Sequence, residues 1–131
     1  MQWAALIAWV TTALGGLVLF LQWARHGGFS QREGIRARRS LPHLALAVVG
    51  LGFWVGYVAN DTRTLAWIAV GILVAVALLG ISMLVISLRG RTTILRTDTP
   101  AEGMFPFPLV VLHGALATST LLLSTLAAAG I

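Results

Sequence analysis

The sequence contains no cysteine, no lysine and only four acidic residues. The absence of cysteine excludes disulfides, thiolate metal sites, iron–sulfur clusters and thiol redox chemistry. The nine basic residues are all arginines and give a formal net charge of +5. They lie in loops separated by apolar runs rather than in one stripe beside aromatic residues, so nucleic acid is not an expected partner.

Most of the remaining sequence is apolar. Hydrophobic residues make up 58% of the chain and charged residues 10%, with a mean hydropathy of +0.91. These values are too apolar for a soluble domain of 131 residues, so we expect a bilayer as the solvent. Arginine without lysine, together with abundant alanine, leucine, glycine and valine, is typical of a GC-rich bacterial genome and predicts a multi-pass protein of the bacterial cytoplasmic membrane.

Four apolar runs cover residues 3–24, 41–58, 64–88 and 107–129. Each has about the 17–25 residues that a helix needs to cross a bilayer. We therefore predict one all-α transmembrane domain, 1–131, folded as a four-helix bundle. The first run is not expected to be a signal peptide, because no basic residue precedes it and Arg25 follows it.

The arginines predict the orientation of these helices. Eight of the nine lie in the first and third loops, and the second loop carries only Arg63. The positive-inside rule then places loops 1 and 3 in the cytoplasm and both termini outside. We also expect the arginine-rich loops to contact anionic lipid.

Short local patterns support these boundaries. Asn60-Asp61 predicts a tight turn that makes the second and third runs an antiparallel hairpin. Ser40 is expected to be the N-cap of the second helix. Residues 99–102, Thr-Pro-Ala-Glu, are typical of a capping box and predict one short interfacial turn.

Aromatic residues near the ends of the runs are expected to anchor the chain at the two membrane interfaces. The outer belt would comprise Trp3, Tyr57 and Trp67, and the inner belt Trp23, Phe105 and Phe107.

Small and polar residues predict which helix faces meet, because association in lipid depends on close approach and polar contacts. Each run has one series of such residues at alternating steps of four and three. The four predicted seams are Ala8, Thr12, Gly15, Leu19, Gln22 and His26; His43, Ala47, Gly50, Trp54 and Tyr57; Gly71, Ala75, Leu78 and Ser82; and His113, Ala117, Thr120 and Ser124. Gly52 and Gly56 form a small-xxx-small motif on another face, which is either a second helix contact, inside the bundle or with another subunit, or a generic pair of glycines.

The three histidines are the strongest chemical signal. His26, His43 and His113 all lie near the cytoplasmic ends of runs and in phase with the seams. His113 is the deepest, about 9 Å inside its run, whereas His43 is only two residues inside. An ionisable residue within a span is a functional candidate. The alternative is a neutral histidine that donates to a carbonyl or hydroxyl of a neighbouring helix.

One hypothesis is that His43 and His113 are the axial ligands of a single b-type haem. This ligation needs two neutral imidazoles on facing helices at nearly one depth, with small residues beside them. Space for the macrocycle would come from Ala47, Gly50, Gly114 and Ala117. The propionates would pair with Arg38, Arg39 and Arg89.

Two stretches carry a resemblance that bears on this hypothesis. Residues 38–47, RRSLPHLALA, and 112–117, LHGALA, resemble the histidine-bearing helices of small four-helix cytochrome b561-type proteins. That resemblance implies a b haem between helices and electron exchange with quinones or periplasmic carriers, and a single histidine pair implies at most one haem. Residues 105–114 also resemble small actinobacterial four-helix membrane proteins, which imply no function.

Other classes of function stay open at this point. A metal site would join His26 to the other two histidines. A small dimeric transporter would use His113 as its deep titratable group, since no span contains Asp or Glu. No motif predicts an enzyme acting on its own. The main alternative to an electron-transfer subunit is an accessory subunit of a larger membrane complex, such as a respiratory assembly, with other membrane subunits as partners.

Overall fold

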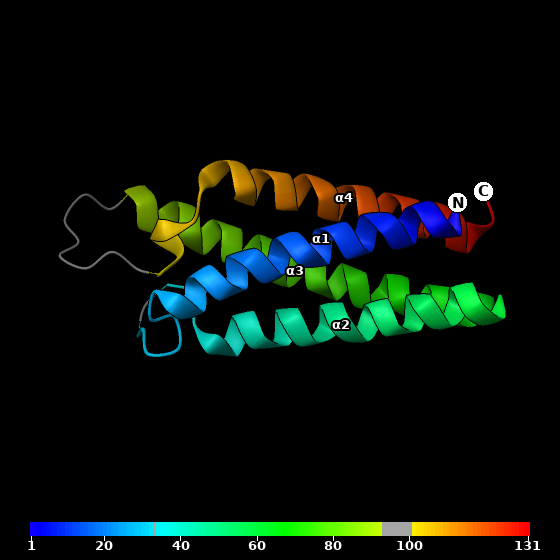
Figure 1. The fold of residues 1–131 in the computed structure, drawn as a ribbon, viewed down its shortest axis with the longest axis horizontal. Coiled ribbons are helices and arrows are strands. Elements are labelled where there is room, and N and C mark those ends of the chain that lie inside the picture. Colours follow the sequence, from blue (N-terminus) through cyan, green and yellow to red (C-terminus); the bar gives the residue numbers. More distant parts are fainter. Residues whose placement is uncertain (33, 93–100) are drawn as a thin grey trace.

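A computed structural model describes residues 1–32, 34–92 and 101–131. The described elements are all helical (Figure 1). They are α1 (Gln2–Arg25), α2 (Ala37–Asn60), α3 (Arg63–Thr92), a short 3-10 helix η1 (Ala101–Met104) and α4 (Phe107–Ala129). Each of the four long helices is long and apolar enough to cross a membrane by length and composition, which confirms a multi-pass, four-helix protein.

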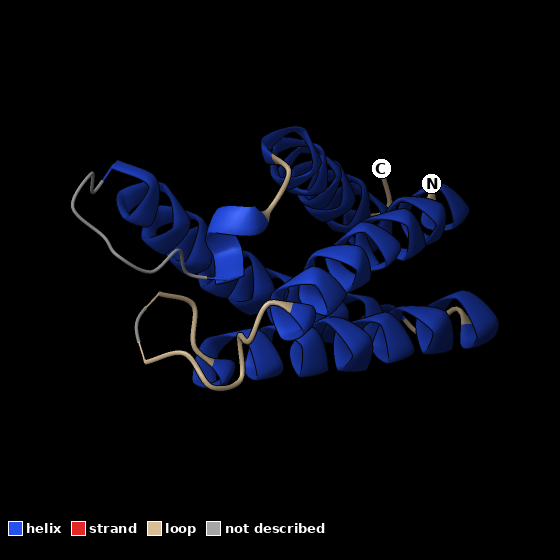
Figure 2. Ribbon diagram, turned by 60° about the vertical axis from the view of Figure 1, so that its left-hand side comes forward, coloured by secondary structure: helices blue, strands red, loops and turns tan. Residues whose placement is uncertain are grey.

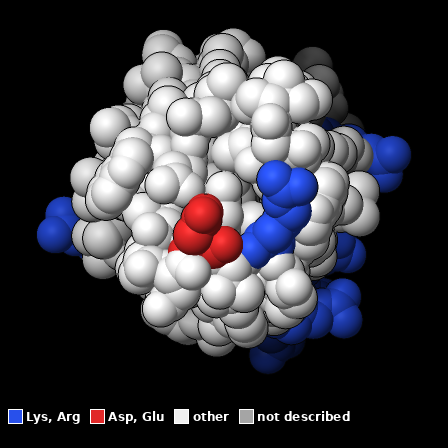
Figure 3. All heavy atoms as spheres, turned by 90° about the vertical axis from the view of Figure 1, so that its right-hand side faces the viewer, with Lys and Arg blue, Asp and Glu red and all other residues white. Residues whose placement is uncertain are grey.

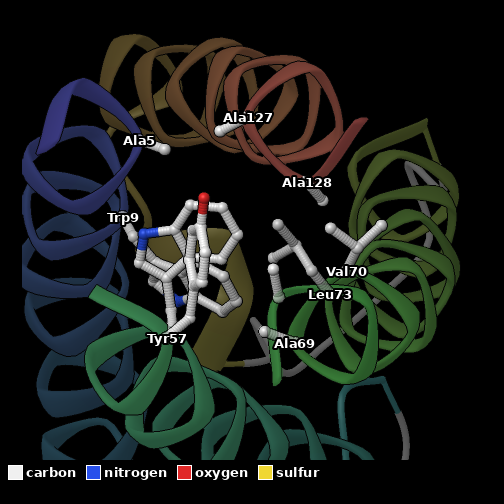
Figure 4. Close-up of a cluster of buried hydrophobic side chains, with 10 residues drawn as sticks. Ala5, Trp9, Tyr57, Ala69, Val70, Leu73, Ala127 and Ala128 are labelled. Carbon is white, nitrogen blue, oxygen red and sulfur yellow. The ribbon is translucent and has the colours of Figure 1, made fainter. Parts of the chain in front are cut away.

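The helices form two closely packed pairs. α2 packs mainly on α3, and α1 packs mainly on α4, the helix at the other end of the sequence. Looser contacts of α1 with α2 and of α3 with α4 close the ring, so α1 lies diagonally across from α3 and α2 across from α4 (Figure 4). The bundle therefore has an approximate twofold arrangement in which α1 corresponds to α3 and α2 to α4.

The two ends of the bundle differ in chemistry. Both termini lie at one end, together with the turn between α2 and α3, and we call it the turn end (Figure 1). Its surface carries few charged side chains (Figure 3). Residues 26–32 and 34–36 and η1 lie at the other end (Figure 2), which we call the arginine end. The described arginines at that end are Arg25, Arg32, Arg36, Arg38, Arg39 and Arg89.

α2 begins earlier than its apolar run suggests. Its N-cap is Arg36, and Ser40 is buried inside the first turn, so the prediction of Ser40 as the N-cap is wrong. Pro42 lies within the helix rather than ahead of it. A proline this near the start removes a single intrahelical hydrogen bond, which the packing of α2 against its neighbours tolerates.

The predicted hairpin turn is present. Asp61 adopts the left-handed conformation, with φ of 52°, and its N–H donates to the carbonyl oxygen of Tyr57 at 2.8 Å. The Asn60 side chain donates to the carbonyl oxygen of Gly56. Asparagine and aspartate are the residues that best tolerate this geometry besides glycine, so the chain can reverse direction within two residues.

An aromatic cluster fills the half of the bundle nearer the turn end (Figure 4). Ring centroids lie 6.1 Å apart for Trp9 and Trp54 and 5.1 Å apart for Trp54 and Tyr57. The indole N–H of Trp54 donates to the carbonyl oxygen of Gln2. Tyr57 is buried in this cluster, so its assignment to the outer aromatic belt is wrong, whereas Trp3 and Trp67 are exposed as a belt requires.

The buried face of α3 differs from the predicted seam. Gly71, Ala75 and Leu78 are exposed, and a Cβ added to Gly71 would meet nothing within 4 Å. The prediction that Gly71 marks a helix contact is therefore wrong. The face that packs inward comprises Ala66, Ala69, Val70, Leu73 and Val76. α3 is apolar on every side and has small residues on both faces, so residue size alone does not identify the buried one.

Candidate functional site

His43 and His113 lie at the same depth of the bundle. Counted from Ala37 and Phe107, each is the seventh residue of its helix, and both helices begin at the arginine end. The apolar runs predicted that His113 lies deeper than His43. That prediction is wrong, because α2 starts four residues before its apolar run. The two imidazole ring centroids are 6.5 Å apart, with ring planes at 66°. Two diagonal helices thus bring their histidines together inside the bundle.

Each imidazole is held by one backbone carbonyl of a neighbouring helix. Nδ1 of His43 lies 3.0 Å from the carbonyl oxygen of Val76 on α3, and Nδ1 of His113 lies 3.1 Å from that of Thr12 on α1. A carbonyl oxygen only accepts hydrogen bonds, so Nδ1 carries the proton in both rings. In a neutral imidazole this tautomer leaves the Nε2 lone pair free to bind a ligand.

Glycines form the wall against which both rings pack. A Cβ added to Gly16 would lie 2.9 Å from Cε1 of His113, and a Cβ added to Gly80 would lie 3.2 Å from Cε1 of His43. At the predicted packing residue Gly15 the nearest His113 atom would be 3.7 Å away, an ordinary contact. A Cβ at Gly114 would meet nothing within 4 Å, so Gly114 does not line the site as predicted.

Three further predicted small residues lie at two kinds of position. Gly50 is buried, and a Cβ there would lie 3.0 Å from both the Trp9 ring and the Ile72 side chain. Ala47 and Ala117 are half-buried on the histidine-bearing faces of α2 and α4.

The Gly52 and Gly56 motif lies away from the histidines. A Cβ at Gly56 would lie 3.3 Å from Leu65, whereas one at Gly52 would meet nothing within 4 Å. The two glycines line a shallow apolar groove between α2 and α3 with Val49, Phe53 and Leu65. Gly52 therefore does not mark a close helix contact within the bundle.

The arginines proposed for haem propionates lie at the arginine end, nearer the surface than the histidine pair. Arg39 precedes His43 by about one helical turn and donates from Nη1 to the hydroxyl of Ser82 on α3 at 3.2 Å. Arg38 and Arg89 are exposed. A basic rim thus lies one or more turns beyond the imidazoles.

His26 lies apart from the histidine pair. It caps α1, is exposed, and its Nδ1 is 2.7 Å from the carbonyl oxygen of Gln22 in its own helix. Within residues 1–32, 34–92 and 101–131, no group of three His, Cys, Asp or Glu side chains is placed to hold a metal ion. The structure therefore brings two of the three histidines together and leaves His26 outside.

A polar strip continues from His113 toward the turn end. The hydroxyls of Thr12 and Thr120 are 3.0 Å apart and join α1 to α4. Ser124, one turn further along α4, is fully buried, and its hydroxyl has no hydrogen-bond partner among the described residues. These residues belong to the predicted seams of α1 and α4.

A second buried polar network, at the arginine end, was not predicted. Glu102 is 1% exposed, and its carboxylate accepts the Ile35 N–H and the Gln31 side-chain amide, both at 2.9 Å. Gln31 in turn accepts the Ala101 N–H at 3.0 Å, and the Trp23 indole N–H donates to the Ile35 carbonyl at 2.9 Å. We call these five residues the loop cap, because they tie the loop after α1 to η1 ahead of α4.

Two predictions concern residues of the loop cap. Trp23 is 1% exposed, so it is not an interfacial anchor of the inner belt, whereas Phe107 is exposed. Glu102 was expected to complete a capping box with Thr99, which lies outside the described residues. The Glu102 carboxylate accepts hydrogen bonds from loop 1, and a turn does form at Ala101–Met104. The glycine at position 34 is a sequence feature that could have indicated the contact between loop 1 and Glu102, because a Cβ there would overlap the Glu102 carboxylate.

Together these features define the class of protein: a four-helix bundle of membrane-spanning helices with a histidine pair inside it. Comparison with known proteins finds no matching family model, no matching curated protein and no matching solved structure.

Proposed function

We propose that this chain is a small integral membrane subunit that binds one b-type haem between α2 and α4, with His43 and His113 as its axial ligands. The observation that carries the proposal is the meeting of two imidazoles from diagonal helices at one depth, with ring centroids 6.5 Å apart. A bond from imidazole to a transition metal is about 2 Å long, so two axial nitrogens are about 4 Å apart and their ring centres lie somewhat further from each other. The observed spacing suits one iron ion.

The hydrogen bonds of the pair support the same assignment. Histidines that bind metals almost always donate their other ring N–H to a carbonyl, a carboxylate or water, which fixes the tautomer and raises the basicity of the ligand. Both imidazoles have this arrangement through Nδ1, to Val76 and to Thr12. The donor set is neutral and contains no carboxylate, as bis-histidine haem ligation requires.

The surroundings suit a haem with its propionates toward the arginine end. Gly16 and Gly80 let the two imidazoles pack directly against the neighbouring helices, and Ala47 and Ala117 are half-buried small residues on the histidine-bearing faces. Arg38, Arg39 and Arg89 form the basic rim toward which two carboxylates would point. When bound, the haem would supply a one-electron iron couple for an electron-transfer or respiratory complex. The positive-inside rule favours an arginine end in the cytoplasm, facing anionic lipid.

The test is a difference spectrum of protein produced with ample haem and purified in mild detergent. We expect Soret and α bands in the reduced-minus-oxidised spectrum of the wild type and their loss in His43→Ala and His113→Ala. His26→Ala is the matched control, because that residue is exposed and its Nδ1 bonds the Gln22 carbonyl of α1. A colourless wild type, or haem retained by both the His43 and His113 variants, would refute the assignment.

The second candidate function is an accessory subunit without a cofactor. The groove at Gly52 and Gly56 favours it, since close approach at small residues is how helices of different subunits associate in lipid. In that case the two histidines act only as interhelical hydrogen-bond donors. Native purification should then recover a stoichiometric larger complex, and Gly52→Leu should release the chain from it. A colourless protein that purifies as a monomer or homodimer would argue against this function.

A further inference from the structure

The two histidine hydrogen bonds share a spacing on the accepting helices. His113 bonds the carbonyl of Thr12 and packs against Gly16, four residues further along α1. His43 bonds the carbonyl of Val76 and packs against Gly80, four residues further along α3. The carbonyl at position i and the glycine at position i+4 therefore occur together on both helices that receive an imidazole.

Helix geometry explains the spacing. A carbonyl oxygen in a helix points toward residue i+4, whose N–H it already accepts, and only its second lone pair remains available. A ring that reaches this lone pair from a neighbouring helix must pass close to the Cβ position of residue i+4. A Cβ at Gly16 would lie 2.9 Å from Cε1 of His113, and a Cβ at Gly80 would lie 3.2 Å from Cε1 of His43, so even one methyl group would crowd the ring.

Neighbouring glycines show that small size alone does not define these positions. Gly15 is adjacent to Gly16, yet a Cβ there would stay 3.7 Å from the imidazole. Gly71 lies on the same helix as Gly80, yet a Cβ there would meet nothing within 4 Å. The approximate twofold arrangement also relates the two sites, because α1 corresponds to α3 and α2 to α4.

We propose that Gly16 and Gly80 are positioning residues: each forms a notch that admits one imidazole to a helix carbonyl, fixes its proton on Nδ1 and presents Nε2 to a shared ligand between His43 and His113. The identity of that ligand as a haem rests on the function proposed above. The notches themselves are a property of the chain without any ligand.

The first measurement uses haem-free protein in detergent micelles. Nitrogen-15 NMR of labelled histidine reports the tautomer of each ring and the hydrogen bond at Nδ1. We expect Gly16→Ala to shift or abolish the Nδ1–H signal of His113, and Gly80→Ala to do the same for His43. Gly15→Ala and Gly71→Ala are matched controls, since they make the same substitution in the same helices and should leave both signals unchanged.

The second measurement uses haem titrated into the same four variants. Loss of an outer-shell partner of a metal ligand weakens metal binding by about 10–100-fold, which is the loss expected for Gly16→Ala and Gly80→Ala. The electron paramagnetic resonance spectrum of the oxidised protein should also change, because it reports the orientation of the axial imidazoles. The two control variants should match the wild type in both respects.

The outcomes separate the two proposals. If the wild type binds no haem but the NMR changes occur, the haem function fails and the notches stand. If Gly16→Ala and Gly80→Ala behave like their controls in the NMR measurement, the notch proposal is overturned whatever the haem result. NMR changes with unaltered haem affinity and spectrum would overturn the positioning role. Should Gly16→Ala fail to fold, Gly80→Ala decides, because its approach is less severe.

Discussion

The two helix pairs use the same histidine contact but are joined in different ways. α2 and α3 are consecutive in sequence and are linked at the turn end by Asp61 and Thr62. α1 and α4 lie at opposite ends of the sequence, and the loop cap and the Thr12–Thr120 contact connect them through hydrogen bonds. A short covalent turn makes two helices neighbours at little entropic cost, whereas a distant pair depends on specific polar contacts.

The largest effect is expected from Glu102→Ala. The substitution leaves the buried Ile35 N–H without its acceptor and removes one of the two acceptors of the Gln31 side-chain amide, which also donates to the Ile35 carbonyl. Hydrogen bonds to a charged group contribute about 1.5–3 kcal/mol each. We expect the arginine end of the α1–α4 pair to lose about 3 kcal/mol of local stability. Amide hydrogen exchange at Ile35 and Ala101 measures this change.

Two comparisons make the Glu102 prediction specific. Glu102→Gln retains a side-chain oxygen that can accept one of the two bonds, so it should lose less than Glu102→Ala. Exchange at the turn end, for example at Asp61, should not change in either variant. Equal acceleration of exchange at both ends would mean that Glu102 supports the whole bundle rather than the α1–α4 pair.

Trp54→Ala should weaken the contact between the pairs. Trp54 of α2 is fully buried against Trp9 of α1, and its removal leaves a cavity. We expect a loss of about 2 kcal/mol, which is below the roughly 3–5 kcal/mol typical of Trp→Ala in a water-soluble core, because the apolar surface is exchanged with lipid rather than water. Unfolding in mixed micelles with increasing SDS measures it. Trp3→Ala, which removes an exposed indole, should cost far less.

Asp61→Val should affect the α2–α3 pair alone. A β-branched residue at φ of 52° is strained by about 1–2 kcal/mol, and the strain falls on the turn that joins these helices. Glycine adopts a positive φ without strain, so Asp61→Gly should keep nearly the wild-type stability in the same unfolding assay. If both variants lose equal stability, the aspartate side chain matters rather than the backbone conformation.

The smallest effect is expected from Thr120→Val, which removes the hydroxyl contact with Thr12 while keeping the shape of the side chain. Hydrogen bonds between membrane helices contribute about 0.6 kcal/mol on average. Thr118→Val is the control, because the Thr118 hydroxyl is exposed and bonds only within α4. A double-mutant cycle with Thr12→Val isolates the pairwise contribution. An interaction energy of zero would show that the contact does not hold α1 to α4.

The sequence predicts the helices better than it predicts their faces. Apolar runs and turn residues are local signals, so the four spans and the turn at Asn60-Asp61 could be recognised directly. The buried face of α3 depends on which neighbours it meets, and an all-apolar helix gives no local sign of that. The extra turn at the start of α2 was missed because arginines and a proline resemble a loop when they flank an apolar run.

The candidate site was predicted in part, for the same physical reason. His43 and His113 stand out because ionisable residues in phase with a small-residue seam are rare in a span. Gly16 and Gly80 were missed because their importance comes from a carbonyl one turn earlier and an imidazole on another helix. The contacts of Glu102 with loop 1 were missed because its partners there lie 67 and 71 residues away in sequence.

The pairing of α1 with α4 has a consequence for biosynthesis. About a hundred residues separate the end of α1 from the end of α4, so at typical translation rates α1 spends roughly 5–20 s in the membrane before its main partner arrives. During that interval the Thr12 hydroxyl can bond the carbonyl of Ala8 in its own helix, at 2.8 Å. The first helix thus enters lipid with its central hydroxyl already paired and needs no temporary partner while it waits for the last.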